Sequence, residues 1–269
     1  MTFRLAWVTD PHLDHAQVTA LTRHVRELRD GSPDALLVTG DFATAPRLTN
    51  WLRAYRRFAE RPLYFILGNH DYWGGSIGDT RARVREAVAR EPGITWLTES
   101  GIVRLGRTAL VGHDGWYDAR TGDWESRRVR MQDWELVDDL RQAESHADLV
   151  RRIRALADEA EEALVPKVDE AARSAASVLI ATHVPPWPVP PRARPIDPAG
   201  DAIAPWYVAR QLGQSLERIA ARHPEVEFRV LAGHTHVRRR GLVLRDNLRC
   251  DVGRARYGAP GIEDILKLP

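Results

Sequence analysis

The chain has 269 residues, a net charge of +2 and 43% hydrophobic residues, a composition typical of a globular protein with a sizeable core. This small charge gives no support for binding to long nucleic acids, and no apolar run approaches the ~20 residues of a membrane-spanning helix. Cys250 is the only cysteine, which excludes an intrachain disulfide, and residues 1–9 lack the apolar core of a signal peptide. We therefore expect a cytoplasmic protein.

The N-terminal third alternates between short apolar runs and amphipathic stretches. Strands are predicted at 3–9, 34–39 and 63–67, helices at 16–28, 48–58 and 80–90, and a glycine-rich loop at 68–78. In the first helix Val18, Leu21, Val25 and Leu28 share one face. Alternating strands and helices predict a mostly parallel sheet with right-handed crossovers.

The rest of the chain is more varied. Short strands in a meander-like arrangement are predicted at 95–97, 102–105 and 109–111, further strands at 178–181 and 228–231, a helix at 206–222, and a closing hairpin at 242–244 and 248–251. Residues 118–176 are highly charged, mostly helical by spacing and richer in acids than in bases, so we interpret them as a helical insertion or cap. Residues 183–205 form a proline-rich loop.

Polar motifs follow five of the predicted strands and contain five of the chain's ten histidines. These motifs are Asp10-Pro11-His12, Gly40-Asp41, Gly68-Asn69-His70-Asp71, His183, and Gly233-His234-Thr235-His236. Each motif alone has an ordinary explanation, such as a turn or a helix cap. Together they supply carboxylate, imidazole and amide groups, the ligands that a site for two metal ions needs.

In this order and at strand ends, the motifs resemble those of the calcineurin-like metallophosphoesterase family, from Asp10 to His236. The resemblance implies an α/β fold in which a two-sheet β-sandwich is flanked by helices, a four-layer α/β/β/α arrangement. We expect one domain over residues 1–269, with the helical insertion at 118–176 inside it.

The resemblance also implies a ligand set for two metal ions. The sequence does not distinguish whether these ions are Mn, Fe or Zn. The first metal takes Asp10, His12 and His236, the second takes Asn69, His183 and His234, and Asp41 bridges them. The implied enzyme is a metal-dependent phosphohydrolase that cleaves a small or medium phosphoester through a hydroxide bridging the two metals. Phosphomonoesterase and phosphodiesterase activities both stay open, and the alternative is an inactive, protein-binding scaffold of the same fold.

By the same resemblance, His70 faces the substrate, as a general acid or as a phosphate-binding group. Many family members read Gly-Asp-x-x-Asp, and the second Asp orients this histidine. Here Thr44 occupies that position, so the partner of His70 is open. Ala45 replaces the arginine of the protein Ser/Thr phosphatases, and Asp-x-His replaces the Asp-x-x-Tyr of purple acid phosphatases, which disfavours both branches.

Several expectations concern the surroundings of the site. Residues 118–176 and the loop at 185–205 are expected to wall the pocket for a small-molecule phosphoester, and deleting the insertion should leave metal affinity largely intact. Tyr72 and Trp73 are left open between stacking on a base or sugar of the substrate and plain packing. Residues 112–117 are expected to form a structural or pocket-lining turn. His24 is expected at the surface, and the oligomeric state is left open.

Overall fold

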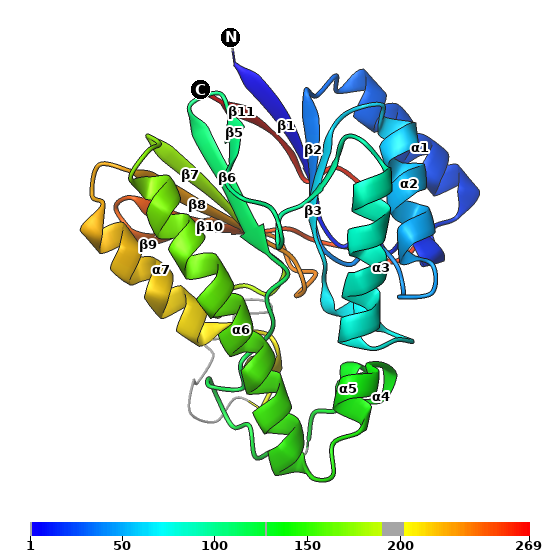
Figure 1. Cartoon of the computed structure of the whole chain (residues 1–269), viewed down its shortest axis with the longest axis vertical. Helices are drawn as coiled ribbons and strands as arrows, with labels where there is room; N and C mark the ends of the chain where they lie inside the picture. Colours follow the sequence, from blue (N-terminus) through cyan, green and yellow to red (C-terminus); the bar gives the residue numbers. More distant parts are fainter. Residues whose placement is uncertain (1, 127, 190–201) are drawn as a thin grey trace.

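The computed structural model describes residues 2–126, 128–189 and 202–269. Two β-sheets stack face to face, and helices cover the outer face of each sheet (Figure 1). The four-layer α/β/β/α sandwich expected from the sequence is thus confirmed. None of the helices in the described ranges is long and apolar enough to cross a bilayer.

The first sheet has five strands in the order β11-β1-β2-β3-β4. Their bounds are β1 Phe3–Val8, β2 Ala35–Thr39, β3 Leu63–Ile66, β4 Ile94–Trp96 and β11 Asp264–Leu268. β1 to β4 are parallel, whereas β11 is antiparallel to β1. The helices α1 Val18–Asp30, α2 Leu48–Ala59 and α3 Ile77–Arg90 flank this sheet on the right of Figure 1.

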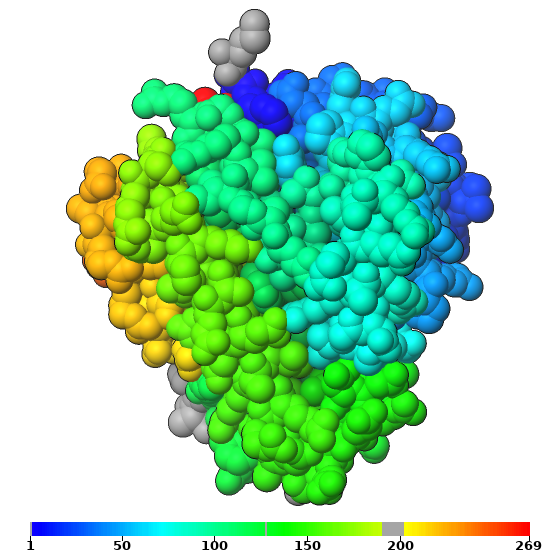
Figure 2. Space-filling model, in the orientation of Figure 1, coloured from blue at the N-terminus to red at the C-terminus, as the bar shows by residue number. Residues whose placement is uncertain are grey.

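The second sheet has six strands in the order β5-β6-β7-β8-β10-β9. Their bounds are β5 Val103–Leu105, β6 Thr108–His113, β7 Ser177–Thr182, β8 Glu227–Ala232, β9 Arg239–Arg245 and β10 Leu248–Val252. β6, β7, β8 and β10 are parallel, and β5 and β9 pair antiparallel at the two edges. The helices α6 His146–Ala172 and α7 Arg210–Arg222 cover it, and Figure 2 shows α6 running down the surface.

Alternation along the strands explains why both faces of each sheet are buried. Leu5 and Trp7 of β1 pack with Leu37 and Leu179 in the cluster between the sheets, whereas neighbouring Ala6 belongs to the cluster beneath the helices. Because a parallel strand here is covered on both sides, β2 is apolar from Ala35 to Val38 and is buried at all five positions.

Two strands, β4 and β11, differ from the sequence prediction. The strand near residue 95 joins the first sheet as β4, parallel to β3, so the predicted meander was wrong and only β5 and β6 form a hairpin. When several short apolar runs follow one another, their sequence pattern does not show which of the two sheets each strand joins. β11 was not predicted at all, because its five residues carry no turn signal that separates them from a loop.

The segment 118–176 is only partly helical. It contains α4 Asp133–Leu136, α5 Asp138–Arg141 and α6, whereas its described residues before 133 form no helix. α6 packs on β6 and β7 as part of the outer layer. Short 3₁₀ helices occur at Leu13–His15, Asn69–Tyr72 and Ala204–Trp206. Much of the predicted proline-rich loop, residues 190–201, lies outside the described residues.

Candidate metal centre

The polar motifs meet at one end of the sandwich. They follow the carboxyl ends of β1, β2 and β3 in one sheet and of β7 and β8 in the other. Because these strands are parallel within each sheet, their carboxyl ends lie at one edge, where ligand sites of α/β proteins commonly form. All seven metal ligands expected from the resemblance, and His70, are brought together there.

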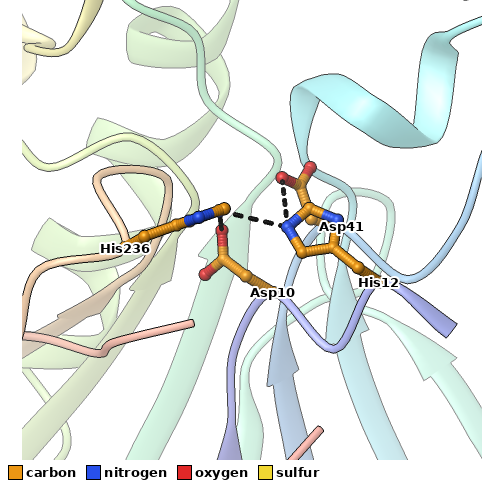
Figure 3. A group of neighbouring side chains, drawn as sticks. All are labelled: Asp10, His12, Asp41 and His236. Carbon is orange, nitrogen blue, oxygen red and sulfur yellow. Dashed lines mark hydrogen bonds and ion pairs between the residues drawn. The ribbon is translucent and has the colours of Figure 1, made fainter. Parts of the chain in front are cut away.

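A first group of side chains comprises Asp10, His12, Asp41 and His236, whose ligand atoms lie within 4.8 Å of one another (Figure 3). The Nε2 atoms of His12 and His236 are 3.1 Å apart. The Nε2 of His236 is 3.4 Å from Oδ1 of Asp10, and that of His12 is 3.8 Å from Oδ2 of Asp41. Four donors converging on one point can enclose a single metal ion.

A second group forms around the side-chain oxygen of Asn69. Its Oδ1 lies 3.0 Å from Nε2 of His183 and 2.9 Å from Nδ1 of His234. The Oδ1 of Asp41 is 3.4 Å from the same Nε2 of His183. One oxygen of Asp41 therefore faces the first group and the other faces the second.

The backbone at the site is strained. Of the eight non-glycine residues with positive φ in the described ranges, five are Asp10, His12, Asp41, His234 and His236. Left-handed conformations are unfavourable for such residues and concentrate at functional sites. They turn the chain sharply after each strand, so that side chains from consecutive loop positions point into one volume.

The motif glycines allow the loops to approach closely. A Cβ at Gly68 would clash with the Asp41 carboxylate and lie 2.7 Å from the backbone nitrogen of Asp41. A Cβ at Gly233 would clash with the Asp10 carboxylate. These two motifs need glycine because a neighbouring ligand occupies the space of a side chain.

Asp71 ties the same loops together. Its buried carboxylate accepts hydrogen bonds from the backbone N–H groups of Asp41 at 2.8 Å, Ala43 at 3.0 Å and Gly68 at 2.8 Å. The fourth residue of the Gly68–Asp71 motif is therefore a loop-bracing group.

The buried carboxylates of the site favour the binding of positive ions. Burial by itself raises the pKa of the Asp41 carboxyl, yet the imidazoles of His183 and His70 hold this pKa well below its usual range. Burial lowers the pKa of His183, but the Asp41 carboxylate, together with Asp10 and the Thr39 carbonyl, raises that pKa to about 10. Buried carboxylates need compensating positive charge, and mixed nitrogen and oxygen donors suit transition metals. The donor set thus fits the implied metal ions.

His70 borders the two groups. Its Nε2 lies 3.8 Å from Oδ2 of Asp41, its backbone N–H donates to Oδ1 of Asp41 at 2.9 Å, and its ring stacks on Trp73 with centroids 3.5 Å apart. Burial lowers the pKa of His70 to about 4, and the Asp41 carboxylate opposes that shift.

Thr44 does not orient His70. Its backbone N–H and its hydroxyl both donate to Oδ2 of Asp14 at 2.8 Å. Among the described residues, Asp41 is the only acid with a carboxylate oxygen within 4.0 Å of the His70 ring nitrogens. In place of an acid at position 44, the ring of Trp73 packs against His70.

A cavity of about 280 Å³ opens over His70 and the second group. Trp73, Tyr207 and Tyr257 form aromatic walls, and residues 130–133 complete the lining. Tyr257 also stacks on His12, with ring centroids 4.4 Å apart. Sequence reasoning missed Tyr207, Tyr257 and the buried Asp133, because none of them stands in a motif or a periodic pattern.

Two further sequence predictions concern the turn at 112–117, which contains His113, and the position of His24. In the turn at 112–117, the buried His113 accepts a hydrogen bond from the Gly115 N–H at 3.1 Å, and Asp114 accepts one from Leu67 N–H at 2.7 Å, so the turn is structural. The expectation of a surface position for His24 was wrong: it is fully buried, with Nε2 2.7 Å from the Tyr55 hydroxyl. His24 lies on the helix face that packs inward.

Comparisons with known proteins agree with this geometry. The family model of calcineurin-like phosphoesterases matches residues 3–238. The fold resembles a phosphopantetheinyl hydrolase from Mycobacterium tuberculosis, with a TM-score of 0.63, 18% identity, and coverage of 97% of this chain and 95% of that one. It also resembles a dimetal phosphatase from Danio rerio, with a TM-score of 0.59, 12% identity, and coverage of 99% and 92%.

A third similar structure is GAP50, described as the anchor in the inner membrane complex of Plasmodium, with a TM-score of 0.51, 10% identity, and coverage of 98% of this chain and 76% of that one. Identities this low show a shared fold alone. No curated protein sequence matches the chain.

Proposed function

The chain belongs to the calcineurin-like phosphoesterase family, and on that premise we propose that this metal-dependent phosphoester hydrolase acts on a small phosphoester at a two-metal centre. We assign the first metal to Asp10, His12 and His236, the second to Asn69, His183 and His234, and a bridging role to Asp41. The observation that carries the proposal is the position of Asp41, whose two oxygens lie 3.8 Å from His12 and 3.4 Å from His183.

Manganese, iron and zinc all suit this donor set. When bound, the metal ions supply an activated water nucleophile and neutralise charge on the phosphoryl group. His70 lines the cavity beside Asp41, so its imidazole can donate to a leaving-group or phosphoryl oxygen. Trp73 and Tyr257 flank it in the cavity wall.

The cavity supports a small substrate. Its volume is about 280 Å³, and its walls combine aromatic rings with the Arg130 side chain. Aromatic faces suit a flat or apolar leaving group, and an arginine at the rim attracts a phosphate. We propose that residues 130–133 of the segment 118–176 contribute to substrate choice, which leaves monoester and diester substrates both open.

The proposal is tested by measuring bound metal and hydrolysis on the same purified chain. Two equivalents of metal are expected after incubation with Mn²⁺, together with hydrolysis of an aryl phosphate ester. A panel of phosphomonoesters, phosphodiesters and cyclic nucleotides then ranks the substrates. Asp41→Asn, purified in parallel, controls for contaminating phosphatases. A folded chain that binds no metal and hydrolyses nothing in the panel would favour the scaffold alternative.

A further inference from the structure

Asp133, at the start of α4, is a fully buried carboxylate that touches the metal centre without belonging to the expected ligand set. It accepts three side-chain hydrogen bonds: from Nδ2 of Asn69 at 2.8 Å, from Nε1 of Trp73 at 2.6 Å and from the hydroxyl of Tyr117 at 2.9 Å. Each of these donors is a residue of the site or packs against one.

The contact with Asn69 determines which way its amide points. A side-chain amide has one acceptor oxygen and one donor nitrogen, and only the oxygen can bind a metal ion. Because Oδ1 of Asp133 also receives the Trp73 N–H, which can only donate, this oxygen is an acceptor and requires the Nδ2 of Asn69 to face it. The Oδ1 must then face His183 and His234, where the second metal is proposed to bind.

Through its contact with Trp73, Asp133 also influences the position of the His70 ring. The Trp73 N–H donates to Oδ1 of Asp133, the oxygen that also receives Asn69. The indole so fixed lies against the His70 ring at a centroid distance of 3.5 Å. One carboxylate oxygen therefore positions both a metal ligand and the residue beside the reacting group.

Tyr117 binds the other carboxylate oxygen of Asp133. Its hydroxyl donates to Oδ2 of Asp133, and its buried ring lies nearly parallel to the imidazole of His234, with centroids 5.9 Å apart. All three hydrogen bonds of Asp133 thus lead to groups that shape the site.

We propose that Asp133 is a positioning residue that sets the amide orientation of Asn69 and holds Trp73 against His70, linking the segment 118–176 to the metal centre. This role rests on the proposed function, since it takes Asn69 as a metal ligand. It also replaces the expectation that the segment could be deleted without loss of metal affinity, because the deletion would remove Asp133.

The test compares Mn²⁺ binding by equilibrium dialysis in three variants of the full chain. Asp133→Leu has the same branching at Cγ and no acceptor, so affinity for one of the two metal ions should fall about 10–100-fold, the usual effect of losing a group that orients a ligand. Asp133→Asn keeps Oδ1 as an acceptor for Asn69 and Trp73, and the Tyr117 hydroxyl can turn to accept from the new amide. Asp133→Asn should therefore bind metal nearly as tightly as the wild type. If Asp133 acted through its negative charge instead, Asp133→Asn would bind metal as weakly as Asp133→Leu.

The third variant, Asp118→Leu, is the matched control. Asp118 is also fully buried in the segment 118–176, but it accepts from the backbone N–H groups of Arg120 at 3.0 Å and Gln211 at 2.8 Å, neither of which belongs to the two ligand groups. Its loss should lower the melting temperature and leave affinity for both metals unchanged.

Trp73→Phe tests the contact between Asp133 and Trp73 by itself, because phenylalanine keeps a ring against His70 and removes the N–H that Asp133 accepts. Metal binding should stay at the wild-type level, while kcat falls for substrates with poor leaving groups.

Wild-type metal affinity in folded Asp133→Leu would overturn the role of Asp133 and leave the proposed function standing. A wild-type chain that binds no metal would overturn both. Should Asp133→Leu fail to fold, Asp133→Glu decides the question, because moving the carboxylate by one methylene misplaces Asn69 and should also weaken one metal. Unchanged affinity there would overturn the proposal.

Discussion

The indole of Trp73 lies against the imidazole of His70, with ring centroids 3.5 Å apart and planes 24° apart. This packing holds His70 at the rim of the cavity, since Thr44 is engaged by Asp14. An imidazole fixed by ring contacts keeps its nitrogens available to a substrate. The roles of His70 as an acid and as a phosphate-binding group can therefore be separated by substrate chemistry.

His70→Ala should keep both metals and lower kcat by ~10²–10⁴-fold, the usual loss when a general acid is removed. The loss should shrink for nitrophenyl esters, because their leaving groups need no proton. Steady-state kinetics on alkyl and nitrophenyl esters, with metal content measured in parallel, checks this. His15→Ala, an exposed histidine near His12, is the control. An equal loss on both ester classes would instead assign His70 to phosphate binding.

Asp41→Asn should lose more activity than any other single ligand substitution. The change removes a negative charge and leaves only one oxygen for two groups of ligands, so both metals should bind more weakly. Metal content and kcat/KM are compared with those of Asp10→Asn, where we expect weakening of one metal. Turnover at the wild-type level in Asp41→Asn would rule out the bridging role.

Gly68→Ala should abolish activity and weaken metal binding, because the added methyl group clashes with the Asp41 carboxylate. Gly78→Ala is the matched control: Gly78 lies in α3, and a Cβ there meets nothing within 4 Å. The control should keep full activity and gain up to about 1 kcal/mol of stability from the better helix propensity of alanine. Assays and thermal melts of the two variants check the contrast, and full activity in Gly68→Ala would contradict the packing described for the site.

His24 should make the stability of the chain depend on pH. Burial, with a smaller effect of Arg23, lowers its pKa from 6.5 to about 4, so between these values the unfolded chain binds the additional proton. Stability should therefore fall as the pH drops from about 6.5 to about 4, by about 3 kcal/mol in total.

Urea unfolding of wild type and His24→Leu at pH 7 and pH 5, both with chelator, measures this contribution. The loss of unfolding free energy between the two pH values should be about 2 kcal/mol larger in the wild type. Equal losses would mean that His24 is protonated in the folded chain.

The sequence predicted the site better than its surroundings. The ligand motifs are local, and each follows a short apolar run, so their meeting at strand ends could be inferred from the five motifs taken together in their order. Parallel strands such as β2 are equally readable, because a strand buried on both faces is a continuous apolar run.

The groups that orient the site could not be predicted in this way. Asp133 is one of many acids in a charged segment, and only the fold places it against Asn69. Tyr257 reaches His12 from a stretch without regular structure, and β11 pairs with the strand at the other end of the sequence. Such contacts depend on long-range packing, which local pattern and propensity do not encode.

The pairing of β11 with β1 has a consequence for biosynthesis. The strand that leads to Asp10 emerges from the ribosome long before β11, the neighbour that covers its free edge. An uncovered strand edge can pair with other chains, so a nascent chain stalled before residue 264 exposes an aggregation-prone surface. His234 and His236 also follow Asp10 by more than 220 residues, so the proposed metal centre can assemble only after residue 236 has been synthesised.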